Sequence, residues 1–92
     1  MSTCPIIAIA PGNAQSGYCV IDRNTLRPLE FGKVDNAKLL RKLASATEQG
    51  WRWAVIEMVA SYGMSVGREV FDTVLWIGRF YQALNTCCPV RL

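Results

Sequence analysis

An unbroken apolar run, residues 6–10, constrains the fold of this chain more than any other feature. A strand that is apolar at every position suits the centre of a sheet, where it is buried. The turn-forming sequence Pro-Gly-Asn at 11–13 ends this run, and a second apolar stretch follows at 17–22. We therefore predict a central strand that returns as a hairpin.

The rest of the chain alternates between strand and helix patterns. Asp35 is expected to cap the first helix and Gly50 to end it. Because the fourth strand follows a helix, it should return to the sheet by a parallel crossover. The pattern predicts an α/β fold whose first three strands form an antiparallel meander. The expected strands are 6–10, 17–22, 29–34, 53–58 and 89–92, and the expected helices are 36–49 and 66–84.

Composition limits the class of protein. The 92 residues predict a single domain, 1–92, and 51% of them are hydrophobic, which disfavours disorder. The net charge of +3 is spread along the chain, so it permits nucleic-acid binding without demanding it. With four cysteines, no Cys-x-x-Cys pair and no histidine, a zinc site is not expected, and the cysteines are interpreted as reduced core residues. Because the sequence shows neither a signal peptide nor a membrane span, we expect a cytoplasmic protein.

The helix expected at 66–84 has an unusually wide apolar arc. One stripe contains Val70, Val74, Ile77, Tyr81 and Leu84, with Phe71 and Leu75 on one side and Trp76 and Phe80 on the other. A helix that covers one sheet face needs a stripe only somewhat wider than ~100°. We expect Trp76 and Phe80 to lie on an exposed flank that forms a homodimer or docks on a target protein.

Three segments together resemble one family of nucleases. The sequence Ile-Ala-Ile-Ala-Pro-Gly-Asn at 7–13 resembles the opening of RuvC-type Holliday-junction resolvases, with Ala10 in place of their aspartate. Ala-Val-Ile-Glu-Met at 54–58 resembles their second acidic strand, and residues 59–80 are similar to RuvC-like proteins of phages and prophages. The resemblance implies a ribonuclease H-like fold, with a mixed five-stranded sheet in the order 3-2-1-4-5 and two helices, truncated after strand five.

The resemblance also implies where the family's chemistry would lie. Its members cut phosphodiesters with two Mg²⁺ ions held by carboxylates. Strands one and four are expected to be parallel neighbours, so position 10 and Glu57 should face one site. Ala10 cannot bind a metal ion, which leaves Glu57 as the remnant ligand of a vestigial site. One carboxylate is too few for two hard cations, so no cofactor is expected and Mg²⁺ should bind poorly.

Several functions remain open from the sequence. The first is a catalytically inactive RuvC-like domain, of phage or mobile-element origin, that binds branched DNA through Lys33, Tyr62 and Arg68 near the former active site. The second is an anti-CRISPR or other anti-defence inhibitor that binds a host protein or protein–nucleic-acid complex. The third is a Mg²⁺-dependent resolvase, either inactivated by an engineered change at Ala10 or completed by acidic residues of a partner chain.

Overall fold

The computed structural model describes residues 4–45, 50–59 and 67–92 of the chain. Within these ranges the elements follow the order that the sequence predicts. The strands are β1 (Pro5–Ala10), β2 (Gln15–Asp22), β3 (Pro28–Asp35), β4 (Trp53–Ile56) and β5 (Val90–Arg91), and the helices are α1 (Asn36–Ala44) and α3 (Arg68–Asn85).

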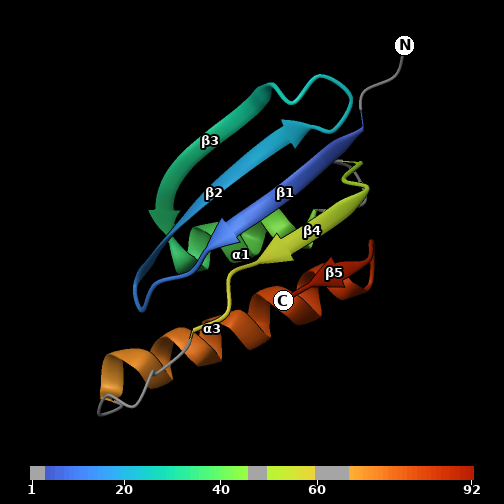
Figure 1. The fold of residues 1–92 in the computed structure, drawn as a ribbon. Helices are drawn as coiled ribbons and strands as arrows, with labels where there is room; N and C mark the ends of the chain where they lie inside the picture. Colours follow the sequence, from blue (N-terminus) through green and yellow to red (C-terminus); the bar gives the residue numbers. More distant parts are fainter. Residues whose placement is uncertain (1–3, 46–49, 60–66) are drawn as a thin grey trace.

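The five strands form one mixed sheet with the order β3-β2-β1-β4-β5 (Figure 1). β1 and β2 pair antiparallel, as do β2 and β3, whereas β4 pairs parallel with β1 and with β5. The predicted meander, crossover and strand order are therefore confirmed. β1 lies at the centre, and β1 and its parallel neighbour β4 are the strands with apolar residues at every position.

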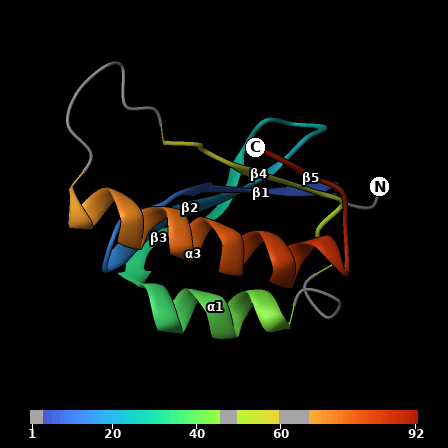
Figure 2. The same ribbon diagram turned by 90° about the horizontal axis from the view of Figure 1, so that it is seen from below.

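Both helices lie on the same face of the sheet, and the opposite face carries neither of them (Figure 2). The pleat of β1 separates its side chains accordingly: Ile7 and Ile9 are buried, whereas Ala8 and Ala10 are exposed. The covered face holds the hydrophobic core. The open face is the feature that positions the candidate site.

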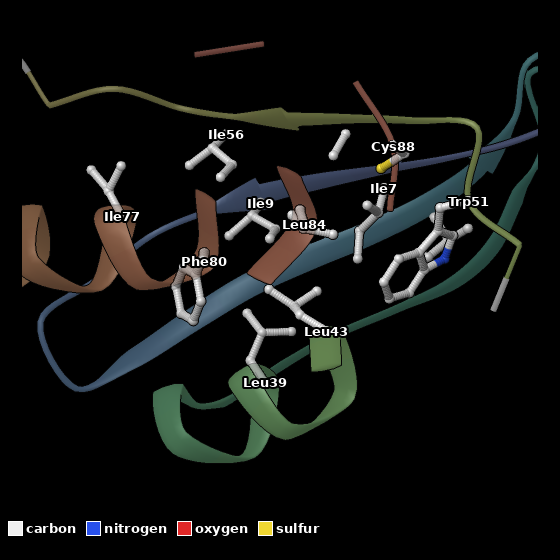
Figure 3. Close-up of a cluster of buried hydrophobic side chains, with 12 residues drawn as sticks. Ile7, Ile9, Leu39, Leu43, Trp51, Ile56, Ile77, Phe80, Leu84 and Cys88 are labelled. Carbon is white, nitrogen blue, oxygen red and sulfur yellow. The ribbon is translucent and has the colours of Figure 1, made fainter. Parts of the chain in front are cut away.

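The core joins the sheet to the two helices (Figure 3). Leu39 and Leu43 of α1 pack with Ile77, Phe80 and Leu84 of α3 against the covered face of the sheet. The spacing of three, four and seven residues places each set on one side of its helix. The remaining core residues are Ile7, Ile9, Val20, Trp51, Ala54, Ile56 and Cys88.

The prediction that Phe80 lies on an exposed flank of the second helix is wrong. Phe80 is 0% exposed, and Trp76 is half-buried against the core with its ring centroid 5.8 Å from that of Phe80. The apolar arc extends too far around the helix for its pattern to fix which part meets the sheet. The exposed apolar residues of α3 lie on the other flank and include Phe71, Val74 and Leu75.

Three smaller predictions also change. Asp35 occupies the N-cap position of α1, but its side chain makes no capping bond and instead accepts a hydrogen bond from Gln15 at 3.2 Å. α1 ends at Ala44, well before Gly50, although Gly50 has the positive φ of 71° that glycine favours. Among the cysteines, Cys88 joins the core, Cys4 and Cys19 are half-buried and Cys87 is exposed.

Asp22 anchors the connection between β2 and β3. Its carboxylate accepts hydrogen bonds of 3.1 Å from the backbone N–H groups of Cys4 and Asn24 and from the Thr25 hydroxyl. These donors, the Cys4 N–H first, hold the pKa of Asp22 below its ordinary value because they favour the charged form. Asp22 thus ties the first described residues to the turn at 23–27.

Candidate functional site

The strand register places Lys33, Gly17, Ala10 and Glu57 in one row across the open face. Lys33 pairs with Gly17, and Gly17 pairs with Ala10. Ile9 pairs with Ile56, and the Glu57 N–H donates to the Ile9 carbonyl at 3.0 Å, so Glu57 follows directly beside Ala10. The predicted juxtaposition of position 10 and Glu57 is therefore present in the structure.

A second row lies one pleat further along the same face. It contains Phe31, Cys19, Ala8, Val55 and Arg91, which pair in that order across all five strands. Small residues occupy the central strands of both rows and larger residues the flanking strands. The result is an open groove of about 720 Å³ whose lining includes the first row together with Ala8, Cys19, Phe31 and Val55.

The turn beside Ala10 is fixed by a buried polar network. The Ser16 hydroxyl donates to the Asn36 side-chain carbonyl, and the Asn36 amide donates to the Gly12 carbonyl at 2.9 Å. The Gly12 N–H donates in turn to the Ser16 oxygen at 3.1 Å. Gly12 is required here, because a Cβ would lie 2.2 Å from the Gln15 carbonyl oxygen. The network clamps the β1–β2 turn onto the start of α1.

The residues at the end of β1 and β4 do not fit the metal site of a two-metal nuclease. Ala10 offers no ligand atom, and Glu57 supplies a single exposed carboxylate. Across the described ranges, no group of three or more His, Cys, Asp or Glu side chains could hold a metal ion. Hard divalent cations need several oxygen ligands from the protein or substrate. We derive no catalytic step through a metal at this position.

The structure separates the basic residues predicted to contact nucleic acid. Lys33 is exposed on β3 and lines the groove. Arg68 opens α3, whose first turn projects past the sheet (Figure 1), and its side chain is 93% exposed, 3.8 Å from Asp72. No described contact joins Arg68 to Lys33 or Glu57. The third predicted residue, Tyr62, lies outside the described residues.

Sequence reasoning missed a second hollow that continues the open face beyond Val55. It has a volume of about 450 Å³, and Trp53, Arg23 and Arg91 are among its lining residues. Both arginines are exposed, and neither is in a salt bridge within the described ranges. The alternation of side chains along a strand could have predicted part of this hollow, because Trp53 of β4 and Arg91 of β5 both occupy odd-numbered positions, which share one face of the sheet. The place of Arg23, in a turn, could not be read from that alternation.

Comparison with known proteins supports the fold. No protein-family model and no curated protein matches the sequence. The structure is similar to that of RuvC from Thermus thermophilus in complex with a Holliday junction substrate, with a TM-score of 0.76 and 13% identity over 95% of this chain. A second Thermus thermophilus RuvC structure has a TM-score of 0.70 and 14% identity over 94% of this chain. The fold is thus the ribonuclease H-like fold of RuvC.

The match covers only part of the RuvC chains. This chain spans 62% and 61% of the two RuvC chains. The comparison establishes the architecture on which a function can be proposed.

Within the described residues, no helix is long and apolar enough to cross a membrane.

Proposed function

We propose that this chain is a RuvC-like domain that binds branched DNA without cutting it. The observation that carries the proposal is the RuvC fold over 95% of the chain, since that neighbour was solved on a Holliday junction. Lys33 and Arg68 would supply phosphate contacts, which dominate the affinity of proteins for DNA. Both side chains are exposed and available for such contacts.

The absence of cleavage in this proposal follows from the donor atoms beside Glu57. In a two-metal reaction, carboxylates hold the ions that activate water and stabilise the leaving oxygen. Ala10 offers only a methyl group where such a donor would be needed, next to the one carboxylate of the row. A protein that binds a junction on this scaffold would therefore hold the DNA without hydrolysing it.

Junction binding can be tested with a fluorescently labelled four-way junction and a linear duplex of the same length. We expect tighter binding to the junction and an affinity that falls steeply between about 50 and about 200 mM salt. Lys33→Gln and Arg68→Gln should each reduce the slope of log affinity against log salt by roughly one. Lys38→Gln is the matched control, because Lys38 is an exposed lysine on α1, beneath the opposite face.

Three results would contradict the proposal. The first is an affinity that salt does not change, because release of counterions from DNA must produce a salt dependence. The second is an equal loss of binding in the Lys38 control, which would show that net charge alone matters. The third is tighter binding to the linear duplex than to the junction, because the proposal rests on a neighbour that was solved on a Holliday junction.

A second candidate function is binding to a protein complex, as an anti-defence inhibitor would do. The observation that favours it is the exposed flank of α3, where Phe71 is 64% exposed beside Val74 and Leu75. Contiguous exposed apolar residues commonly mark a protein interface. This flank is also where a homodimer through α3 would form, because the Phe80 flank is buried in the core.

A further inference from the structure

A cavity of about 510 Å³ lies between α1 and β3, on the side of the sheet that carries the helices. β3 runs directly into α1 (Figure 1), so the strand and the helix meet at a corner formed by Asp35 and Asn36. Val34 of β3 and Lys38 of α1 line the cavity beside this corner. The cavity is therefore separate from the groove on the open face.

An ion pair bridges the cavity away from the corner, where Lys42 donates to Glu30 at 2.9 Å. Tyr18 of β2 lies beneath this pair, with the Lys42 ammonium 5.6 Å from its ring centroid. Its ring covers Gly32, where a Cβ would lie 3.3 Å from the Tyr18 Cε1 atom. Burial raises the pKa of Tyr18, and the Glu30 charge raises it further, so the hydroxyl keeps its proton and adds no negative charge.

The lining carries more positive than negative charge. Three cations, Lys38, Arg41 and Lys42, face one carboxylate, Glu30, which leaves an excess of two positive charges. Glu30 pairs with Lys42, whereas Lys38 and Arg41 form no salt bridge within the described residues. Lys38 lies three positions from Arg41 and four from Lys42, where like charges destabilise a helix. An anion between these side chains would offset their repulsion.

The helix itself does not explain the position of Lys38. Arg41 and Lys42 lie in the last turn of α1, where the helix dipole favours cations. Lys38 is the third residue of the helix, where the same dipole disfavours a cation, and the first turn contains no acidic residue. Asp35, just before the helix, bonds to Gln15 instead. A negatively charged ligand in the cavity would stabilise Lys38 at this place.

The size and charge of the cavity favour a small phosphorylated molecule. Its volume falls among those of small-molecule sites, roughly 300–1,000 Å³. A phosphate monoester carries about −1.5 to −2 charges at pH 7, which matches the excess of the lining. Its three terminal oxygens can accept bonds from two ammonium groups and a guanidinium together. Tyr18 and Val34 offer apolar surface to the rest of the ligand.

We propose that the cavity between α1 and β3 binds a small aromatic phosphate monoester. Lys38, Arg41 and Lys42 hold the phosphate group, and the aromatic ring lies against Tyr18 and Val34. This inference does not rest on the proposed function, because the cavity and the open face lie on opposite sides of the sheet. It holds whether or not the chain binds DNA.

The test uses the full chain, labelled with ¹⁵N, and phenyl phosphate as the probe at constant ionic strength. We expect the probe to shift the amide signals of Gly32, Lys38 and Arg41 until they saturate. Inorganic phosphate lacks the ring and benzoate lacks the phosphate group. Each should therefore bind roughly tenfold more weakly than phenyl phosphate.

One pair of variants with equal charge tests the cations. Lys38→Gln with Arg41→Gln should weaken the binding of phenyl phosphate roughly tenfold or more, because it removes the two cations without salt bridges. The control, Lys33→Gln with Arg52→Gln, removes a lysine and an arginine that are exposed outside the cavity lining. It should bind the probe as the unmodified chain does.

A second pair tests the carboxylate. Glu30→Gln should tighten the binding of phenyl phosphate several-fold, because it frees Lys42 and removes a negative charge from the lining. The control, Glu57→Gln, changes the net charge equally on the open face and should leave the affinity unchanged. Weaker binding in Glu30→Gln than in the unmodified chain would overturn the proposal.

Each of four further results also overturns the proposal. Equal shifts with sodium chloride at the same ionic strength would indicate an adventitious ion only. Equal effects in a variant and its control would assign the binding to net charge. Benzoate or inorganic phosphate that binds as tightly as phenyl phosphate would remove the selection for an aromatic phosphate. Displacement of the probe by a linear DNA duplex would assign the cations of α1 to nucleic acid.

Discussion

The Ser16 hydroxyl donates a 2.5 Å hydrogen bond to the side-chain carbonyl of Asn36, twenty positions along the chain. Both residues are almost completely buried, and the Asn36 amide continues the network to the Gly12 carbonyl. The pair therefore connects the turn after β1 with the first residue of α1. It holds the backbone beside Ala10 in place.

Removal of the Asn36 side chain should destabilise the protein. Asn36→Ala leaves the Ser16 hydroxyl and the Gly12 carbonyl without their described partner, which costs about 1–3 kcal/mol for each buried group left unsatisfied. Chemical denaturation measures the free energy of unfolding. The control is Asn13→Ala in the same turn, where the side chain is exposed, and it should change that free energy little. Equal losses in both variants would contradict the network's role.

The protein should lose stability as the pH is lowered, because the contribution of Asp22 is lost in acid. The folded-state pKa of Asp22 is lowered, mainly by the Cys4 N–H, so its contribution is fully present above the unfolded value of about 3.9. That contribution is lost as the pH falls through the lower, folded value. Asp22→Asn should therefore unfold at lower urea at pH 7, and its stability should depend less on pH below about 4. Asp72→Asn should keep the steep acid dependence of the original chain.

Opposite flanks of α3 should respond differently to truncation of a phenylalanine. Phe80→Ala removes a fully buried ring and should cost about 3–5 kcal/mol of stability. Phe71→Ala removes a ring that is mostly exposed and should cost much less. Thermal unfolding followed by circular dichroism compares them. A larger loss for Phe71→Ala would contradict the burial seen in the core.

The exposed flank of α3, which carries Phe71, Val74 and Leu75, predicts how the chain would associate. Phe71→Ser with Leu75→Ser should weaken a homodimer or a complex with a target protein, because both side chains are exposed and apolar. Sedimentation velocity over a range of concentrations measures the effect on self-association. Arg79→Ser, which removes a guanidinium 4.7 Å from the Trp76 ring centroid, is the control on the neighbouring surface. A chain that stays monomeric at high concentration would rule out the homodimer.

Cleavage of a four-way junction should be absent in Mg²⁺ and in Mn²⁺, because the described residues form no group of three or more His, Cys, Asp or Glu side chains that could hold a metal ion beside Glu57. Ala10→Asp would place one there and should raise Mn²⁺ affinity weakly, since two ligands still make a poor site. Ala8→Asp, one pleat away on the same face, should raise it less. Mn²⁺ binding is measured by calorimetry. Mg²⁺-dependent cutting that Glu57→Gln abolishes would contradict an inactive site.

Apolar segments and turn residues were sufficient to predict where the strands lie, and the helix before β4 predicted the parallel crossover. The order of the strands in the sheet, and with it the adjacency of Ala10 and Glu57, was predicted from the resemblance to RuvC-type resolvases. The buried side of α3 was not, because residues 70–84 are apolar around most of the helix. Thr73, a polar residue, faces the core there with its hydroxyl bonded to the Glu69 carbonyl.

The groove was also beyond prediction from sequence. Its floor depends on Ala8 and Ala10 standing beside Gly17 and Cys19, and this depends on the register of the hairpin. Register comes from the length and shape of the turn, which the Ser16–Asn36 network fixes through contacts between distant segments. No local pattern reports such contacts.

The irregular pairing of β2 with β3 has a consequence for solubility. The register shifts between Val20 and Ile21, and β3 curves as it passes along the edge of the sheet (Figure 1). A straight edge strand of eight residues would offer a continuous ladder of backbone donors and acceptors to the strands of other molecules. A bulge bends the strand and interrupts that ladder. The irregularity thus protects a half-hydrophobic chain against growth into fibrils.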